Sequence, residues 1–204
     1  MKFEIAKKDT SKLILFLAIT FSLPLTTIAQ ISVAKGGIFY AKEFSKDIAL
    51  YSAKTFVMSD VLGSTDEIIK FEVDPLAASS SGELTTLVYR CESKNKEGLI
   101  LGFYGTRWNN AGTSYQAYSF KNLPAKEANE LLDKIEKATA ENFKYIAADN
   151  DNNNIYFHYQ DLTILIYFKD NNNIKLRIYW NDFDSEWEWS TYKKTRKRLE
   201  KKLK

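Results

Sequence analysis

A pair of identical polar segments in the last third of the chain limits the folds that this sequence can adopt. Asp-Asn-Asn-Asn occurs at 151–154 and again at 170–173, and isoleucine follows each time. Asn and Asp tolerate left-handed backbone conformations and hydrogen-bond their own backbone, so both copies predict turns. Between the turns, 162–169 places Leu162, Ile164 and Ile166 on one face, and 155–160 and 174–180 alternate in the same way. This period of two predicts an antiparallel β-meander.

Further runs typical of strands are separated by turn residues. They lie at 67–74, 84–91, 99–104 and 114–120, and 143–148 is expected to add one more strand. The stretch 32–58 is compatible with either a helix or a strand, and its pattern does not decide between them.

Two segments have a helical period instead. From about 123 to 141, Ala128, Leu131, Leu132 and Ile135 form one apolar stripe, which predicts an amphipathic helix. From about 186 to 203 a narrow apolar seam recurs every three or four residues, and Ser185 with Glu188 fits a capping box. The expected fold is therefore α+β, with a mainly antiparallel sheet of about seven or eight strands, an amphipathic helix and a basic C-terminal helix.

The first 29 residues are typical of a targeting segment rather than of part of the folded domain. Residues 1–12 contain four lysines against two acids, 13–29 carry no charge, and the segment ends in Thr27-Ile28-Ala29. This order is typical of a secretory signal peptide, with an uncleaved anchor as the alternative. We expect a single globular domain at 30–204 that is exported to the periplasm or exterior of a bacterial cell. Cys91 is the only cysteine, so no intramolecular disulfide can form.

The side chains that common catalytic and metal sites need are scarce. One histidine and one cysteine cannot supply the usual zinc ligand sets, and no nucleophile elbow is present. Residues 149–160 imitate the start of a calcium loop, but Asn154 and Gln160 stand where Gly and Glu are required, and a strand follows. We therefore expect no metal and no cofactor, and favour a non-catalytic protein of the bacterial envelope or exterior that binds an unidentified partner or ligand.

Two groups of residues are candidates for ligand binding. The glycine-punctuated segment 102–112 is expected to be a loop that displays Tyr104, Arg107 and Trp108, unless Trp108 folds inward in an ordinary hairpin. The second group lies on the face of the meander opposite its aliphatic residues, where it would suit an anionic or glycan ligand if no helix covers it. Its members are Tyr156, His158, Tyr167, Lys175, Arg177 and Tyr179. For His158, an ordinary place on the face of a sheet is the alternative.

The C-terminal segment offers two further hypotheses. Asp182, Asp184, Glu186 and Glu188 beside two tryptophans would suit a glycan-active hydrolase, although acids also gather at helix starts. Residues 193–204 hold eight basic residues and one acid, which would suit an anionic membrane surface or simply a solvated helix. The basic residues are Lys193, Lys194, Arg196, Lys197, Arg198, Lys201 and Lys202, with Lys204 at the end. The expected partners are an envelope protein, a glycan or an anionic membrane surface. Nucleic acid is disfavoured for an exported protein.

Overall fold

The computed structural model describes residues 47–108, 110–149, 152–169 and 173–203. All of them belong to one compact unit that spans 39–204. The predicted signal peptide and residues 30–46 lie outside the described residues. In the described part of the chain, eight strands form two antiparallel sheets of four, accompanied by three α-helices. The predicted α+β fold is confirmed.

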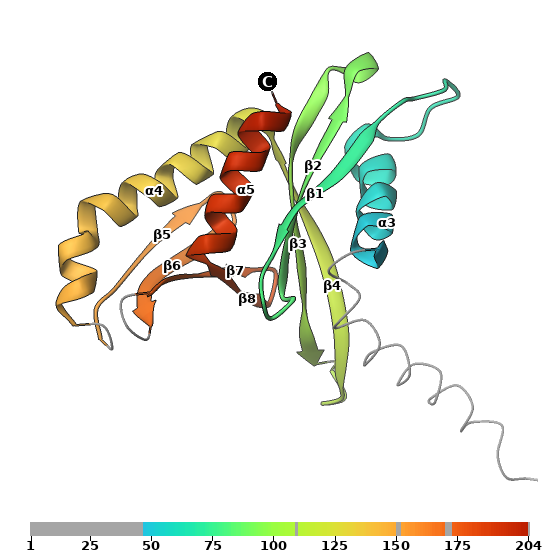
Figure 1. Ribbon diagram of the computed structural model, residues 1–204. Helices are drawn as coiled ribbons and strands as arrows, with labels where there is room; N and C mark the ends of the chain where they lie inside the picture. Colours follow the sequence, from blue (N-terminus) through green and yellow to red (C-terminus); the bar gives the residue numbers. More distant parts are fainter. Residues whose placement is uncertain (1–46, 109, 150–151, 170–172, 204) are drawn as a thin grey trace, which may run out of the picture. The chain divides into compact units, whose positions relative to one another are not determined.

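Each sheet is an up-and-down meander that is followed by a helix (Figure 1). The first sheet contains β1 (Glu72–Ala78), β2 (Leu84–Cys91), β3 (Lys96–Trp108) and β4 (Ser114–Pro124), and α4 (Ala125–Ala148) follows it. The second sheet contains β5 (Asn154–Tyr159), β6 (Leu162–Lys169), β7 (Asn173–Trp180) and β8 (Phe183–Glu188), and α5 (Trp189–Lys202) follows it. In both sheets the strand order is the order along the chain, so every neighbour is joined by a hairpin.

The larger hydrophobic core lies where both sheets meet α4 and α5. The second sheet contributes every second residue of its strands, as the alternation of buried and half-buried residues in β6 shows. Trp187 of β8, Tyr192 of α5 and Phe103 of β3 are the largest side chains that are fully buried. Because both helices insert side chains into this core, one face of each sheet is closed to solvent.

A second core lies on the opposite face of the first sheet. Here α3 (Asp47–Phe56) and the π-helical turn η1 (Val57–Leu62) pack Ala53, Val57 and Val61 against Leu87 and Ile100. The first sheet is therefore covered on both faces, which explains why β2 is buried almost throughout. Within the ambiguous stretch 32–58, the part that is described is helical.

The predicted C-terminal helix is confirmed, but it begins three residues after the predicted start at about residue 186. Residues 183–188 form the edge strand β8, with Phe183, Ser185 and Trp187 on its buried side, and the helix begins at Trp189. Asn181 and Asp182, both with positive φ, make the two-residue turn that joins β8 to β7. The apparent capping box makes no side-chain cap hydrogen bond at the helix start.

Other boundaries also differ from the sequence predictions. Residues 143–148 continue α4 rather than forming a strand, because Ile146 extends the apolar stripe into the core. The first strand runs over 72–78 rather than 67–74, with a bulge around Leu76. Residues 102–108 belong to the long strand β3 rather than to a loop.

Candidate functional site

The outer face of the second sheet carries the largest group of predicted site residues. Strand register places His158, Thr163, Tyr179 and Asp184 in one row across the four strands. The next row holds Tyr156, Leu165, Arg177 and Glu186, and the third holds Asn154, Tyr167, Lys175 and Glu188. All six residues predicted from the meander therefore share this face, which we call the outer face.

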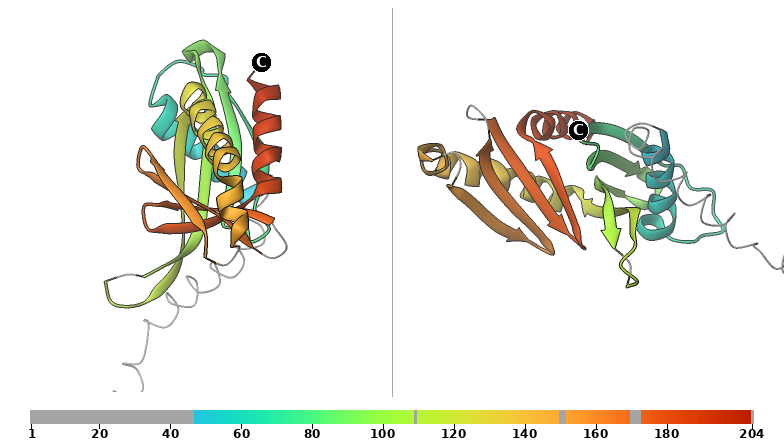
Figure 2. Two further views of the ribbon diagram at one scale, coloured as in Figure 1. Left: turned by 90° about the vertical axis from the view of Figure 1, so that its left-hand side faces the viewer. Right: turned by 90° about the horizontal axis from the view of Figure 1, so that it is seen from below.

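None of the described helices covers the outer face. The α4 and α5 side chains that contact this sheet belong to the core on its other side, and the view from below shows the strands in front of the helices (Figure 2). Tyr156 is 67% exposed and Tyr179 is 38% exposed, and His158 is also exposed. The face thus presents an aromatic surface to solvent.

The two cations of the outer face are already paired. Lys175 Nζ lies 2.6 Å from a Glu186 carboxylate oxygen, and the Arg177 guanidinium donates two hydrogen bonds to Asp184, at 2.6 and 3.0 Å. These carboxylates hold the pKa values of both cations above their ordinary range. These pairs were not predicted, because the sequence pattern of Asp184 and Glu186 indicated a helix start, whereas both residues lie on the neighbouring strand β8.

The aromatic members of the outer face are held by local contacts. His158 Nδ1 lies 2.9 Å from the Thr163 hydroxyl, and the His158 ring packs edge-on against Tyr156 with 5.8 Å between ring centres. Burial raises the pKa of the Tyr167 hydroxyl, which lies 3.5 Å from Glu186. Lys134 of α4 donates to the His158 carbonyl at 2.9 Å. The side chains of this face are therefore ordered before any ligand arrives.

The edge of β8 is closed by the loop between β1 and β2. The Ser80 N–H donates to a Glu188 carboxylate oxygen at 2.8 Å, and the Glu186 N–H donates to Glu83 at 3.1 Å. The Ser185 hydroxyl donates to the Glu83 carbonyl at 3.2 Å. Burial alone would raise the pKa of Glu188, but the hydrogen bonds from Ser80 outweigh it and hold the pKa below its ordinary value.

These contacts occupy all four carboxylates that the hydrolase hypothesis requires. Asp184 and Glu186 bind cations, Glu188 accepts the Ser80 N–H, and Asp182 pairs with Arg107 at 2.5 Å. A general acid of a glycosidase needs a raised pKa, and Glu188 has a lowered one. The arrangement serves to join β8 to its neighbours.

We expect the Glu188 contact to make stability depend on pH. A carboxylate whose pKa is lower in the folded than in the unfolded state stabilises the fold above its unfolded pKa, and this stability is lost as the pH falls through the folded pKa. Hydrogen bonds to charged groups contribute about 1.5–3 kcal/mol, and partial exposure of Glu188 reduces this to about 1–2 kcal/mol. At neutral pH, the free energy of unfolding measured in urea should therefore be higher for the wild type than for Glu188→Gln by about that amount. This difference should disappear below about pH 4. A gap that stays constant down to acid pH would contradict the assignment.

The other predicted ligand group does not form an exposed loop. Tyr104 is buried in the second core, beside Phe120. Arg107 pairs with Asp182, and its guanidinium lies over the Phe183 ring, 5.4 Å from the ring centre. The side chain of Trp108 lies outside the described residues. Gly102 instead permits close packing between β3 and β4, since a β-carbon there would lie 3.1 Å from the Phe120 ring.

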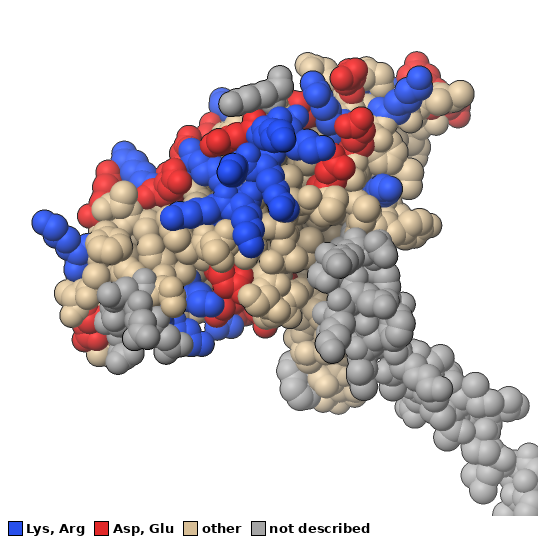
Figure 3. All heavy atoms as spheres, viewed as in Figure 1, with Lys and Arg blue, Asp and Glu red and all other residues tan. Residues whose placement is uncertain are grey.

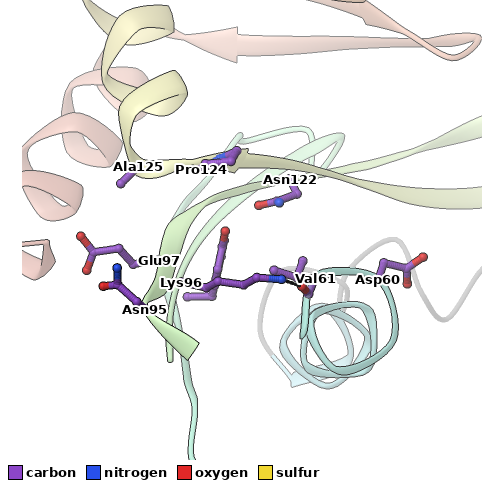
Figure 4. Close-up of a pocket in the computed structure, with 9 residues that line it drawn as sticks. Asp60, Val61, Asn95, Lys96, Glu97, Asn122, Pro124 and Ala125 are labelled. Atoms are coloured by element: carbon purple, nitrogen blue, oxygen red, sulfur yellow. Dashed lines mark hydrogen bonds between the residues drawn. The ribbon is translucent and has the colours of Figure 1, made fainter. Parts of the chain in front are cut away.

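A hollow that the sequence did not indicate lies at the start of α4. It has a volume of about 570 Å³ between η1, the beginning of β3 and the end of β4 (Figure 4). Its polar side chains come from Asp60, Tyr89, Asn95, Lys96, Glu97 and Asn122. Lys96 Nζ donates to the Val61 carbonyl across the hollow. Its charges are mixed and Lys96 is already engaged, so the hollow shows no preference for a ligand class.

Comparison with protein-family models, with curated proteins and with solved structures finds no match to this chain. In the described residues, no three His, Cys, Asp or Glu side chains are grouped so that they could hold a metal ion. No helix of the described part is both long and apolar enough to cross a membrane.

Proposed function

We propose that this chain is an exported, non-catalytic binding protein and that the outer face of the second sheet is its ligand surface. The observation that carries the proposal is that this face displays exposed Tyr156, His158 and Tyr179 while no described helix packs on it. Export is supported by the basic start and uncharged apolar stretch at 1–29. The carboxylates of β8 form ion pairs and accept a backbone hydrogen bond, which argues against a role for them in glycan hydrolysis.

The ligand class follows from the charge state of the face. Lys175 and Arg177 are neutralised by Glu186 and Asp184, so an anion would have to displace these internal pairs before it could bind. An uncharged polymer faces no such competition. Tyr and His side chains combine a flat apolar ring with a polar tip, which suits the face of a sugar ring and its hydroxyl groups. We therefore propose a neutral glycan as the ligand.

The spacing of the aromatic side chains suits an extended ligand. His158 and Tyr179 stand in one row with Thr163 between them, so their strands are about 10 Å apart, two strand spacings. Tyr156 lies two residues from His158 on the same side of β5. A chain of sugars lying across the strands would contact these aromatic residues in succession.

The test is saccharide binding by paired surface variants. We expect chitin oligosaccharides or another neutral oligosaccharide on a glycan array to bind the wild type. The double variant Tyr156→Thr/Tyr179→Thr, which keeps β-branched residues in the strands, should bind roughly tenfold more weakly or worse. Tyr51→Ala removes a tyrosine that is 75% exposed on α3 and should bind like the wild type. Equal binding by all three proteins, or no bound saccharide at all, would contradict the glycan proposal.

A further inference from the structure

The basic residues of α5 fall into two sets with different surroundings. One set is used inside the molecule. Arg196 binds Asp133 and Glu136 of α4 at 2.7 and 2.9 Å, Arg198 donates to the Leu76 carbonyl at the bulge of β1, and Lys202 binds Asp74 at 2.6 Å. These contacts fasten α5 to α4 on one side and to β1 on the other.

The second set consists of Lys193, Lys194, Lys197 and Lys201, which we call the lysine row. All four side chains are exposed, and none forms an ion pair with a residue that the structure describes. Lys193, Lys197 and Lys201 follow one another at intervals of four residues, and Lys194 lies three residues before Lys197. All four therefore lie on one side of the helix, along about 12 Å of its length. The space-filling view shows basic side chains gathered over α5 (Figure 3).

The lysine row forms no ion pair that would stabilise the fold within the described residues. Like charges four residues apart on a helix repel each other, and Lys193, Lys197 and Lys201 follow one another at that spacing. The one acid of the helix, Glu200, binds Arg196 rather than a lysine of the row. The described part of the chain thus supplies carboxylate or carbonyl partners for the basic residues that fasten α5, but no carboxylate for the row, which points to an anionic partner outside the molecule.

The chemistry of the row favours a diffuse anionic surface. Lysine is a flexible point charge, whereas selective recognition of a single phosphate commonly uses the forked donors of arginine, and both arginines of α5 are engaged internally. Trp189 stacks on Tyr192 at 4.7 Å beneath Lys193, so no aromatic ring stands free among the lysines to stack on a nucleic acid base.

We propose that the lysine row docks the protein on an anionic phospholipid surface. The helix would lie parallel to the surface, held by charge alone, because no apolar side chain lies between the four lysines to insert among acyl chains. Since α5 packs against the inner side of the second sheet, docking through the row leaves the outer face of that sheet accessible. This inference does not rest on the proposed glycan binding.

The experiment measures partition of the full chain onto vesicles. Vesicles of equal parts phosphatidylglycerol and phosphatidylcholine are compared with pure phosphatidylcholine, which also reports binding through the apolar N-terminal segment. The variant Lys193→Gln/Lys194→Gln/Lys197→Gln/Lys201→Gln removes the row. The matched control Lys54→Gln/Lys126→Gln/Lys137→Gln/Lys144→Gln removes the same charge from exposed lysines of α3 and α4.

We expect partition of the wild type onto anionic vesicles to fall about fivefold for each lysine of the row, or a hundredfold or more for all four. The control variant should lose far less of its partition onto anionic vesicles. Raising the ionic strength should release the wild type from these vesicles. Oligosaccharide binding and the melting temperature of the row variant should stay at wild-type values, which separates this surface from the outer face. Inorganic phosphate should compete no better than chloride at equal ionic strength.

Several results would overturn the proposal. Equal losses in the row variant and the control would mean that net charge alone governs partition. Equal binding of the wild type to anionic and neutral vesicles would exclude an electrostatic surface. Tighter binding to double-stranded DNA than to anionic vesicles, lost only in the row variant, would make nucleic acid the partner.

Discussion

Replacement of Gly98 by alanine is expected to destabilise the protein by about 2–3 kcal/mol, with a fall in melting temperature of roughly 5–10 °C. Gly98 lies in β3, between Tyr89 on one neighbouring strand and Pro124 on the other. A β-carbon at this position would stand 2.3 Å from the Leu123 carbonyl oxygen and 2.9 Å from both Pro124 Cα and the Tyr89 ring. Two of these three atoms belong to the backbone, so no side-chain rotation can relieve the clash.

Gly105 provides the matched control for this prediction. It lies in the same strand, but its added β-carbon would meet only the Phe183 ring, at an ordinary contact distance of 3.6 Å. Gly105→Ala should be neutral or slightly stabilising, because alanine restricts the unfolded chain more than glycine does. Thermal unfolding followed by circular dichroism measures both variants. Equal melting temperatures for Gly98→Ala and the wild type would show that the strands can move apart without cost.

The sequence predicted the strands of the second sheet well because their periodicity is local. Alternation within β6 and β7 is enough to place Tyr167, Lys175 and Arg177 on one face, and it did so correctly. The ion pairs that neutralise Lys175 and Arg177 depend on the register between β7 and β8, which no local pattern contains. The shared face could therefore be predicted, whereas its charge state could not.

The error at β8 has a physical cause that the sequence partly reveals. Ser185 through Glu188 satisfy a capping box and also alternate between inward and outward residues, so the segment is locally consistent with a helix start and with a strand. The neighbouring strand decides, because Trp187 can be buried against Leu176 only if the segment is extended. Asn181-Asp182 between two alternating runs was the available signal, since this dipeptide suits a two-residue hairpin turn.

Residues 102–108 belong to the ordinary hairpin of β3 and β4, which the sequence offered as the alternative to a loop that displays Tyr104, Arg107 and Trp108. Its glycines suggested a loop, but Gly102 is needed where the Phe120 ring crosses β3, and Tyr104 points into the core beneath α3. A glycine in a strand often marks such a close approach rather than a turn. The packing of α3 that buries Tyr104 comes from a distant part of the chain, and the pattern of 32–58 was ambiguous, so the burial could not be anticipated.

Trp187 joins the second sheet to α5, and Trp187→Ala is expected to lower the free energy of unfolding by about 3–5 kcal/mol. Its side chain is completely buried, and its ring meets Tyr192 of α5 edge-on with 5.3 Å between ring centres. Removing the ring would leave a large cavity between β8 and α5. Urea unfolding at neutral pH should show the full loss, because neither the ring nor its neighbour is charged.

Trp187→Phe should lower the free energy of unfolding by under about 1.5 kcal/mol, much less than the complete burial of the Trp187 ring suggests. Trp187 Nε1 is buried and has no hydrogen-bond acceptor among the described residues, so phenylalanine removes an unsatisfied donor, which offsets about 1–3 kcal/mol of the lost packing. Trp180 provides the contrast, because its Nε1 donates to Asp161 at 2.8 Å. Trp180→Phe leaves that carboxylate without one of its donors and should be the more damaging of the two, although Trp180 is the more exposed ring. If Trp187→Phe proves as destabilising as Trp187→Ala, the indole N–H contributes to stability and the packing of the ring alone does not explain its place in the core.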